Sequence, residues 1–231
     1  MKKVKVIAVI GKAGSGKNTF VNRYMNTPDT FKYEGDDQEY LAIYRKIKDS
    51  FEEKIHLIVP FTTRPMRPGE VEGRDYHFYK EGSVDDLICS GEIAQATYFR
   101  EWLYGFAWDE FIEDKLNIGI FNPGAVIDLL DYDGLDITTI YIDAPDKDRL
   151  LRQLNREDNP DVKEIVRRFG TDDYDFREEV LAEIPNLIRI NNPNITKKFW
   201  EQGYGDQLFG PYEEFLKVIN SKLSKEMGIN D

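Results

Sequence analysis

The feature that most constrains the fold is a glycine-rich segment near the N-terminus, GKAGSGKNT at 11–19. It follows a continuous β-branched run over 4–10, which is typical of a central parallel strand buried on both faces. It opens a helix that we expect to reach about Asn26. A glycine loop between a strand and a helix points successive backbone N–H groups inward, and the helix N-terminus adds partial positive charge. The segment therefore predicts a site for the phosphates of a nucleotide.

Two positions in this segment bear on the ligand. Lys17 is placed to reach the β- and γ-phosphates of ATP, and Asn18 stands where a Ser or Thr hydroxyl commonly touches Mg²⁺. An amide oxygen can still face the metal, directly or through water, so we expect ATP and Mg²⁺ as cofactors. The departure at Asn18 weakens the metal assignment but not the nucleotide site, and the alternative is a glycine-rich turn without a ligand. The predicted ATP-binding residues are Gly11, Ala13, Gly14, Ser15, Gly16, Lys17, Asn18 and Thr19, with Asn18 as the candidate metal ligand.

The composition excludes several classes of protein. The chain has 231 residues, 41% of them hydrophobic and 32% charged, which is typical of one globular α/β domain. Its net charge of −12 argues against general nucleic-acid binding but is compatible with small nucleotides as partners.

The single cysteine, Cys89, precludes an intrachain disulfide and favours the cytoplasm; we expect it to be buried. No segment reaches the ~18 apolar residues of a membrane span, and the first apolar run predicts a strand rather than a signal peptide. We expect a monomer or homodimer with no membrane partner.

Short apolar segments alternate with helical patterns along the chain. Strands are expected over 55–61, 93–99, 118–121, 137–142 and 187–190, and helices over 40–47, 84–89, 126–130, 149–156, 162–169 and 212–223. Such alternation predicts an α/β fold in which a parallel sheet lies between two layers of helices.

A second motif, TTRPMRPGEVEGRDYHF at 62–78, carries the clue to a second substrate. Arg64 and Arg67 stand three residues apart on an expected loop, where two guanidinium groups can hold one phosphate through several charge-assisted hydrogen bonds. Tyr76 adds a neutral hydroxyl, and the glycines allow close approach of the backbone. The alternative is an arginine-rich solvated loop.

This window resembles the signature of the guanylate kinase family, T-T-R-x-x-R-x-G-E-x-x-G-x-D-Y-x-F, at every fixed position. The resemblance extends more weakly from residue 4 to about 192 and leaves the last 35 or so residues without a counterpart. It implies a P-loop fold in one domain, 1–231, with a core (1–30, 55–61, 110–150 and 170–231), a monophosphate-binding insertion (about 62–109) and a small lid (about 151–169). It also implies transfer of the γ-phosphate of ATP to a nucleoside monophosphate, with GMP or dGMP as the leading candidate for the acceptor.

The resemblance assigns roles to individual residues. The acceptor monophosphate would be bound by Arg64, Arg67, Tyr76, Gln95 and Tyr104, with Gln95 at the position of a glutamate that reads guanine. The catalytic residues would be Lys17, Arg156, Arg167 and Arg168, which neutralise the transferring phosphate. Arg152 lies in the same lid segment. Acidic residues are interleaved there, so an ordinary salt-bridged helix surface stays open for any one of these arginines.

The positions that would read the base depart from the family pattern. Phe61 and Phe106 replace small hydroxyl residues, and Gln95 replaces a carboxylate with an amide that offers one acceptor and one donor group. These changes make the pocket more apolar, so a different or modified (deoxy)nucleoside monophosphate is an alternative acceptor. A misplaced alignment is the other explanation, in which Glu92 or Glu101 takes the role of the glutamate.

Further departures leave other readings open. Gly119 and Phe121 stand where the family commonly carries two aspartates, and Asp143 is either a substitute for them or a turn residue. His56 and His77 are too isolated to form a dyad or metal site and are read as structural. The competing functions are a non-catalytic interaction domain of the same fold and another kind of P-loop kinase, such as one acting on a coenzyme.

Overall fold

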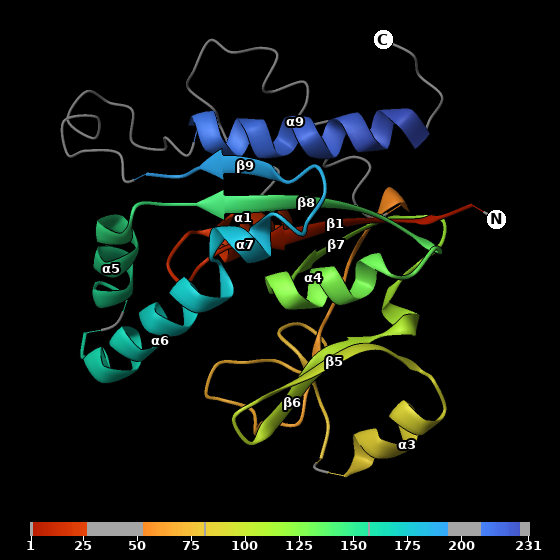
Figure 1. The fold of residues 1–231 in the computed structure, drawn as a ribbon, viewed down its shortest axis with the longest axis horizontal. Helices are drawn as coiled ribbons and strands as arrows, with labels where there is room; N and C mark the ends of the chain where they lie inside the picture. The colour runs from red at the N-terminus through yellow and green to blue at the C-terminus, as the bar shows by residue number, and fades with distance from the viewer. Residues whose placement is uncertain (1, 27–52, 81, 157, 194–208, 227–231) are drawn as a thin grey trace.

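The computed structural model describes residues 2–26, 53–80, 82–156, 158–193 and 209–226 (Figure 1). The helix predicted over 40–47 lies outside these residues. No helix in the described part of the chain is long and apolar enough to cross a membrane.

The core is a five-stranded parallel sheet with the strand order β2-β7-β1-β8-β9. The strands are β1 (Val4–Ile10), β2 (Ile55–Leu57), β7 (Leu116–Ile120), β8 (Leu135–Asp143) and β9 (Ile188–Asn191). β1 lies at the centre, and its residues from Val6 to Ile10 are at most 1% exposed. The prediction of a central strand buried on both faces is therefore confirmed.

Helices cover both faces of this sheet, so the predicted three-layer α/β fold is confirmed (Figure 1). On one face, side chains of β1 such as Ile7 pack with α1 (Lys17–Asn26) and α9 (Phe209–Glu226). Phe20 contacts the rings of Tyr212 and Phe215 edge-on, and these two rings stack on each other. The opposite face of β1 packs against α4 (Pro123–Leu130) and α7 (Glu178–Leu181). The C-terminal helix, which has no counterpart in the sequence resemblance, thus completes one layer of the core.

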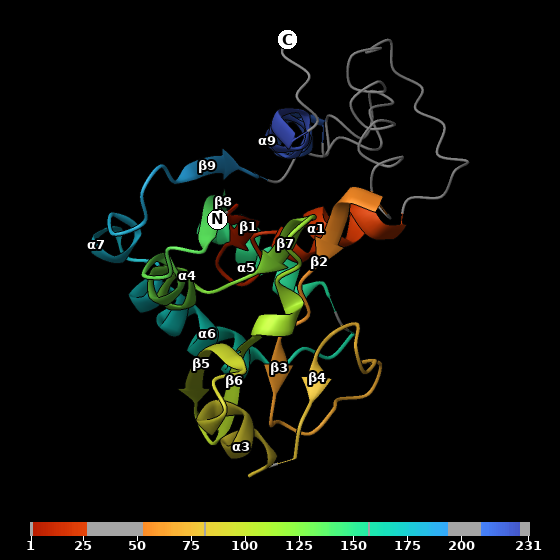
Figure 2. The same cartoon turned by 90° about the vertical axis from the view of Figure 1, so that its right-hand side faces the viewer.

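A second, four-stranded sheet lies beside the core in the order β4-β3-β6-β5 (Figure 2). It consists of β3 (Phe61–Thr62), β4 (His77–Phe78), β5 (Ile93–Phe99) and β6 (Trp102–Ala107), and α3 (Ser83–Cys89) packs on it through Val84. The single strand predicted over 55–61 is wrong. The chain leaves the core sheet after Ile58, whose N–H still bonds to Ile118, and passes Pro60, which has no N–H for a ladder, before entering the second sheet. Strand β6 was not predicted.

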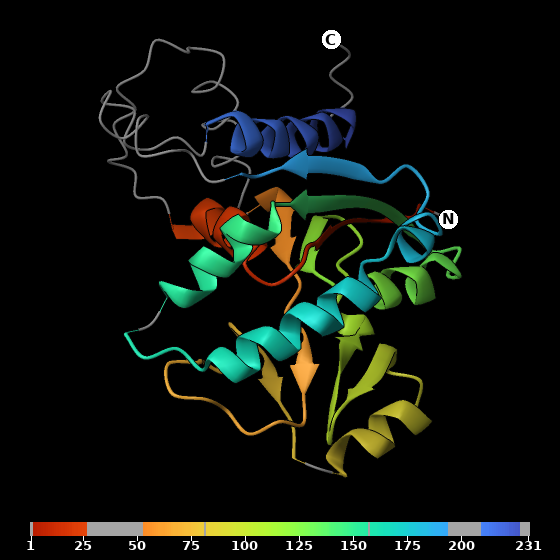
Figure 3. The ribbon, with the colours of Figure 1, turned by 60° about the vertical axis from the view of Figure 1, so that its left-hand side comes forward.

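Two further helices lie between the sheets on one side of the molecule (Figure 3). They are α5 (Asp146–Leu154) and α6 (Val162–Asp175), and α6 is longer than the predicted 162–169. Asp161 caps α6 by accepting a hydrogen bond from the N–H of Glu164 at 3.1 Å. The expectation that Cys89 is buried is wrong, because it lies exposed at the end of α3.

The two histidines join the sheets. His56 on β2 and His77 on β4 each bond through Nε2 to the Glu110 carboxylate, at 3.1 and 2.9 Å. Glu110 belongs to a 3₁₀ turn, Trp108–Glu110, and also accepts from the N–H of Val59 at 2.8 Å. These contacts fit the structural reading of both histidines.

Candidate functional site

The glycine loop takes the conformation that its sequence predicts. Gly14 and Gly16 have φ of +77° and +98°, a region that L side chains rarely adopt. A Cβ on Gly14 would lie 2.6 Å from the carbonyl oxygen of Arg149, and one on Gly16 would lie 2.5 Å from the side chain of Asn192. The loop is thus packed too closely against α5 and the end of β9 for any larger residue.

Side chains from α5 and from Asn192, the residue after β9, hold the loop by its carbonyl groups. Arg149 donates from Nε to Ala13 at 3.0 Å, and Arg152 donates to Gly14 and Ser15, both at 3.1 Å. Asn192 donates to the Ser15 carbonyl at 2.8 Å. Because side chains outside the loop bind these carbonyl groups, they hold the curved backbone of the loop in place. Arg152 therefore supports the loop in this structure rather than standing free in a lid.

The buried arginine of α5 also ties the loop to α6. Arg149 is fully buried. Its Nη2 donates to Asp172 of α6 at 2.7 Å, and its guanidinium carbon lies 4.3 Å from the ring centroid of Phe169. The same Asp172 carboxylate accepts the N–H of Ala13 at 2.7 Å. An internal carboxylate thus already binds one backbone N–H of the glycine loop, that of Ala13.

Lys17, at the start of α1, is the cation of this loop. Burial lowers its pKa from 10.5 to about 8, Asp172 opposes that shift, and Arg149 and Arg168 add to it. Its Nζ lies 3.4 Å from the carbonyl oxygen of Lys12. Lys17 is therefore mostly protonated at neutral pH and loses its proton as the pH rises through about 8. Asn18 and Thr19, the next residues of α1, are exposed.

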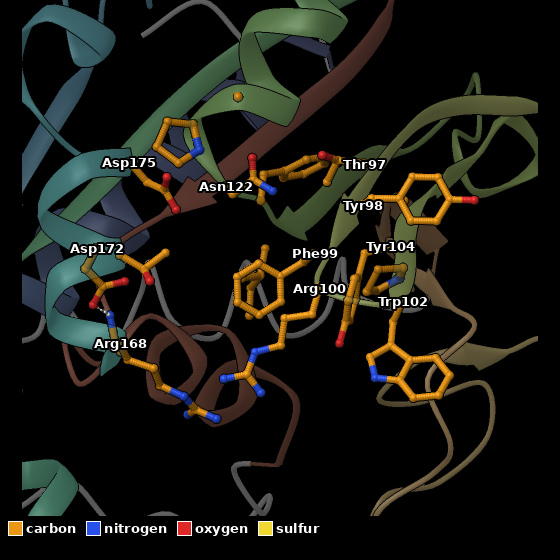
Figure 4. A pocket seen from close by; sticks show the side chains of 18 of the residues that line it. Thr97, Tyr98, Phe99, Arg100, Trp102, Tyr104, Asn122, Arg168, Asp172 and Asp175 are labelled. Atoms are coloured by element: carbon orange, nitrogen blue, oxygen red, sulfur yellow. Dashed lines mark hydrogen bonds between the residues drawn. The ribbon is translucent and has the colours of Figure 1, made fainter. Parts of the chain in front are cut away.

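A cavity of about 780 Å³, here called the central cavity, lies where the two sheets and α6 meet (Figure 4). Its lining residues are Ala13 and Pro60; Arg64, Arg67, Glu70 and Tyr76; Gln95, Thr97, Tyr98, Phe99, Arg100, Trp102, Tyr104, Gly105 and Phe106; Ile120, Phe121, Asn122, Pro123 and Gly124; and Glu164, Arg167, Arg168, Thr171, Asp172, Asp175, Arg177 and Val180. Five predicted monophosphate-binding residues and two predicted catalytic arginines thus line one space, with Ala13 of the glycine loop. Arg156 is exposed beyond the end of α5 and does not line the cavity; its catalytic role stays a prediction.

Arg64 is fixed in the cavity wall by its own loop. It is 7% exposed and donates two hydrogen bonds to Glu70, at 3.0 and 2.8 Å, and these bonds lower the pKa of the Glu70 carboxyl. Glu70 also accepts the N–H of Arg67 at 2.7 Å, while the Arg67 side chain is exposed. Thr62 accepts the N–H of Arg64 at 3.2 Å. The loop therefore presents two guanidinium groups, one held rigidly and one free to move.

Aromatic rings connect this loop to α6 along the cavity wall. The Arg64 guanidinium lies over the ring of Tyr76 at 5.4 Å, and Tyr76 meets Tyr104 edge-on at 6.1 Å. Tyr104 meets Phe99 at 6.4 Å, and Arg167 of α6 lies over Phe99 at 5.4 Å. A continuous row of ring contacts thus runs from Arg64 to Arg167 through Tyr76, Tyr104 and Phe99.

Part of the cavity wall is apolar, as the departure at Phe106 predicts, whereas Phe61 does not line the cavity. Phe106 of β6 stacks on Phe121, which follows β7, with ring centroids 4.3 Å apart. Gln95 is 6% exposed, and its Nε2 donates to Asp128 at 3.0 Å. Gln95 lines the cavity whereas Glu92 and Glu101 do not, so the position of Gln95 does not support the misplaced-alignment alternative.

Asp143, the possible substitute for the two aspartates of the family pattern, lies outside the central cavity. Asp143 at the end of β8 accepts a hydrogen bond from the Tyr141 hydroxyl at 3.2 Å and does not line the cavity. Among the residues described, no group of three or more His, Cys, Asp or Glu side chains could hold a metal ion. Asn18 therefore stays the candidate ligand for a metal that arrives with a nucleotide.

Sequence reasoning missed several cavity residues, notably Arg100, Glu164 and Asp172. Glu164 accepts from Arg167 at 2.7 and 2.8 Å, from Arg168 at 3.0 Å and from Arg100 at 3.2 Å. The contact between Arg100 and Glu164 spans 64 positions in the sequence. No local pattern could reveal it.

Comparison with known proteins identifies the family of this chain. The guanylate kinase family model matches residues 41–181. A guanylate kinase from Legionella pneumophila (strain Paris) is 35% identical over 172 residues, covering 64% of this chain and 79% of the relative. One from Wolbachia pipientis wMel is 27% identical over 164 residues, covering 62% and 79%. The crystal structure of guanylate kinase from Anaplasma phagocytophilum shares the fold, with a TM-score of 0.51 and 16% identity, over 98% of this chain and 88% of that one. This chain belongs to the guanylate kinase family.

Proposed function

We propose that this protein transfers the γ-phosphate of ATP to a nucleoside monophosphate, and that GMP and dGMP are its preferred acceptors. The names of its relatives point to guanylate as the acceptor. In this proposal the loop at 11–19 holds ATP, and Arg64, Arg67, Tyr76, Gln95 and Tyr104 hold the acceptor. The enzyme is a nucleoside monophosphate kinase, a transferase.

The observation that carries the proposal is the shared cavity. The proposed acceptor-binding arginines and the arginines of α6 line the same space as Ala13 of the glycine loop. Phosphoryl transfer requires donor and acceptor oxygens to lie nearly in line, and needs little chemistry from the protein beyond positioning and charge. The cavity is lined by Ala13 of the glycine loop, by Arg64 and Arg67 of the second motif, and by Arg167 and Arg168 of α6, an arrangement that suits this requirement.

The protein groups would act mainly through electrostatics. Lys17 and the arginines 167 and 168 would stabilise the charge that spreads over the transferring phosphoryl oxygens. Arg156 would join them if α5 and the following residues moved toward the cavity. No residue is needed as a covalent nucleophile.

Magnesium suits these residues only as a companion of ATP. Mg²⁺ commonly keeps several waters and takes one or two protein oxygens in addition to phosphate oxygens. The exposed side chain of Asn18, directly after Lys17, offers one such oxygen. When bound with ATP, the ion would neutralise part of the phosphate charge.

The same proposal divides the single domain into working parts. The core (1–30, 55–61, 110–150 and 170–231) would hold ATP, the insertion at about 62–109 would bring the acceptor, and the lid at about 151–169 would close over both. Closure would exclude water and so limit hydrolysis of ATP. The single cysteine is consistent with a reducing compartment, and we propose the cytoplasm.

A second candidate acceptor is favoured by the rings of Phe106 and Phe121 and by the amide of Gln95 in the cavity wall. The amide of Gln95 offers a single acceptor oxygen, and its Nε2 already donates to Asp128, whereas the guanine edge presents two neighbouring donors. A site built for one hydrogen-bonding pattern rejects another strongly. A kinase for another base, or for a modified one, is therefore the second candidate.

A kinase assay that couples ADP formation to a colour change tests both candidates. It would compare ATP turnover with each common ribo- and deoxyribonucleoside monophosphate and with 5-modified pyrimidines. Turnover with GMP or dGMP supports the first candidate, and turnover only with another acceptor supports the second. No turnover with any acceptor would overturn the proposal in favour of a non-catalytic domain.

Variants of two arginines in one loop test the acceptor site. Arg64→Ala removes a buried guanidinium from the cavity wall, and we expect kcat/KM for the acceptor to fall roughly 100-fold, since a hydrogen bond to a charged group contributes ~1.5–3 kcal/mol. Arg74→Ala is the matched control, because Arg74 pairs with Asp75 in the same loop and does not line the cavity. Equal effects of the two changes would contradict the assignment.

A further inference from the structure

The turn between β5 and β6 has an unusual residue at its tip. Phe99 pairs with Trp102, so Arg100 and Glu101 form a two-residue hairpin loop. Arg100 has φ of +56°, and the other described non-glycine residue with positive φ is Asn186, a type that tolerates this conformation. Two-residue hairpins commonly place Gly, Asn or Asp at such a position. A long cationic side chain is therefore held here against the preference of the backbone.

The side chain of Arg100 extends into the central cavity. Figure 4 shows it reaching from the hairpin toward the side where Arg168 and Asp172 of α6 lie. Its Nη2 lies 3.2 Å from Oε2 of Glu164, and its guanidinium lies 5.8 Å from the ring of Phe99. The tip of the second sheet thus contacts α6 across the mouth of the cavity.

The partner of Arg100 is the residue that orients the arginines of α6. Glu164 holds Arg167 with two hydrogen bonds and Arg168 with one, so three guanidinium groups share one carboxylate. The hydrogen bonds from Arg167 and then from Arg168 lower the pKa of Glu164 to about 2. Glu164 therefore stays ionised at any physiological pH, and its position decides where Arg167 and Arg168 stand over the cavity.

Stability alone does not account for this arrangement. The side chain of Arg100 is 54% exposed, and an exposed ion pair contributes little to folding. A left-handed conformation at a non-glycine residue costs at least as much as such a pair returns. Strained residues of this kind concentrate at functional sites because the surrounding structure holds them there for another reason.

We propose that Arg100 is a positioning residue of the transfer reaction, which acts through Glu164 to bring the hairpin of the second sheet to α6 and so places Arg167 and Arg168 over the cavity. The inference rests on the proposed function, because it assigns the two arginines to the transferring phosphate. Arg100 need not touch either substrate. Its effect should therefore appear in turnover rather than in binding of ATP, whose loop it does not contact.

Two variants separate the guanidinium from the backbone strain. Arg100→Asn removes the charge and suits the positive φ, so the folded state should be as stable as wild type in thermal unfolding. We expect its kcat on the best acceptor of the wild type to fall about tenfold or more, since small misplacements of catalytic groups are costly, with KM for ATP within about twofold. Arg100→Lys keeps the charge and the strain, and it should recover part of the lost kcat.

A double-variant comparison tests the route through Glu164. Glu164→Gln should lower kcat by itself, because it releases Arg167 and Arg168. If Arg100 acts through Glu164, the double variant Arg100→Asn/Glu164→Gln should be no slower than Glu164→Gln within about twofold. Arg189→Gln is the matched control: Arg189 forms an exposed ion pair with Glu178 away from the cavity, and its loss should leave kcat within about twofold.

The outcomes are distinct. A kcat for Arg100→Asn within twofold of wild type would overturn the inference, and so would losses that multiply in the double variant or a loss confined to KM. Absence of wild-type turnover with every acceptor would instead refute the proposed function itself.

Discussion

The lowered pKa of Lys17 predicts how activity depends on pH. With a pKa of about 8, roughly nine-tenths of the molecules carry a protonated Lys17 at pH 7 and roughly one-tenth at pH 9. Phosphate groups have a second pKa near ~6 and are largely ionised across this range. If protonated Lys17 is required to bind the phosphates of ATP, kcat/KM for ATP should fall about tenfold between pH 7 and pH 9.

The sign of the effect on stability is opposite. Because burial lowers the pKa of Lys17 from 10.5 to about 8, the folded state binds fewer protons than the unfolded state between these values. The contribution of Lys17 to the free energy of unfolding therefore rises with pH over that interval, by up to about 3 kcal/mol. A loss of activity at pH 9 thus would not reflect titration of Lys17 unfolding the protein.

The assay is a profile of kcat/KM for ATP from pH 7 to 9.5 with saturating acceptor, which reports groups of the enzyme form that binds ATP, here the complex with the acceptor. Chemical denaturation at pH 7 and pH 9 checks the fold. Lys17→Arg is the control, because arginine stays charged throughout, and its profile should lack the inflection near pH 8 whatever its absolute rate. A wild-type profile that stays level to pH 9.5 would refute the reasoning.

Two further predictions concern the walls of the site. Arg149→Met should lower the free energy of unfolding by about 3–5 kcal/mol, because it leaves Asp172 without its buried partner; urea denaturation measures this, and a loss below 1 kcal/mol would contradict the role given to Arg149. Gly105→Ala should cost about 1–3 kcal/mol and raise KM for the acceptor, because its Cβ would lie 2.8 Å from the ring of Phe61 and collide with the backbone of Gln95. Gly134→Ala is the control, since nothing lies within 4 Å of its Cβ, and equal effects of the two alanines would count against the close packing.

Local signals in the sequence predicted much of the fold. The β-branched run before the glycine loop became the central strand β1, and the alternation of strands and helices became the parallel sheet with helices on both faces. The second sheet was harder to predict. Pro60 interrupts one apolar run and sends its two halves to different sheets, and β6 is part of a hairpin whose tip carries Arg100 instead of a turn residue such as glycine. Tertiary pairing overrides propensity at such places.

The site was predictable wherever its residues belong to a contiguous motif. The loop at 11–19 and the arginines Arg64 and Arg67 belong to two such motifs, whereas Gln95 and Tyr104 were assigned from the family resemblance; Arg64, Arg67, Gln95 and Tyr104 line the cavity together with Ala13 of the loop. The residues that hold the site in place were not predicted. Glu164, Asp172 and Arg149 act through partners far away in the sequence, and charged residues on a helix look like solvated surface until the partner is known.

Binding of a bisubstrate compound tests the central claim most directly. The compound would join adenosine and the acceptor nucleoside through five phosphates, so that it reaches from the glycine loop to the arginine-bearing loop. Isothermal titration calorimetry should show one molecule bound per chain, competing with both ATP and the monophosphate, and binding more tightly than either because the second contact is intramolecular. Arg64→Ala should weaken it while leaving the affinity for ATP unchanged. Two molecules per chain, or one that excludes ATP but not the monophosphate, would contradict the claim that donor and acceptor meet in one cavity.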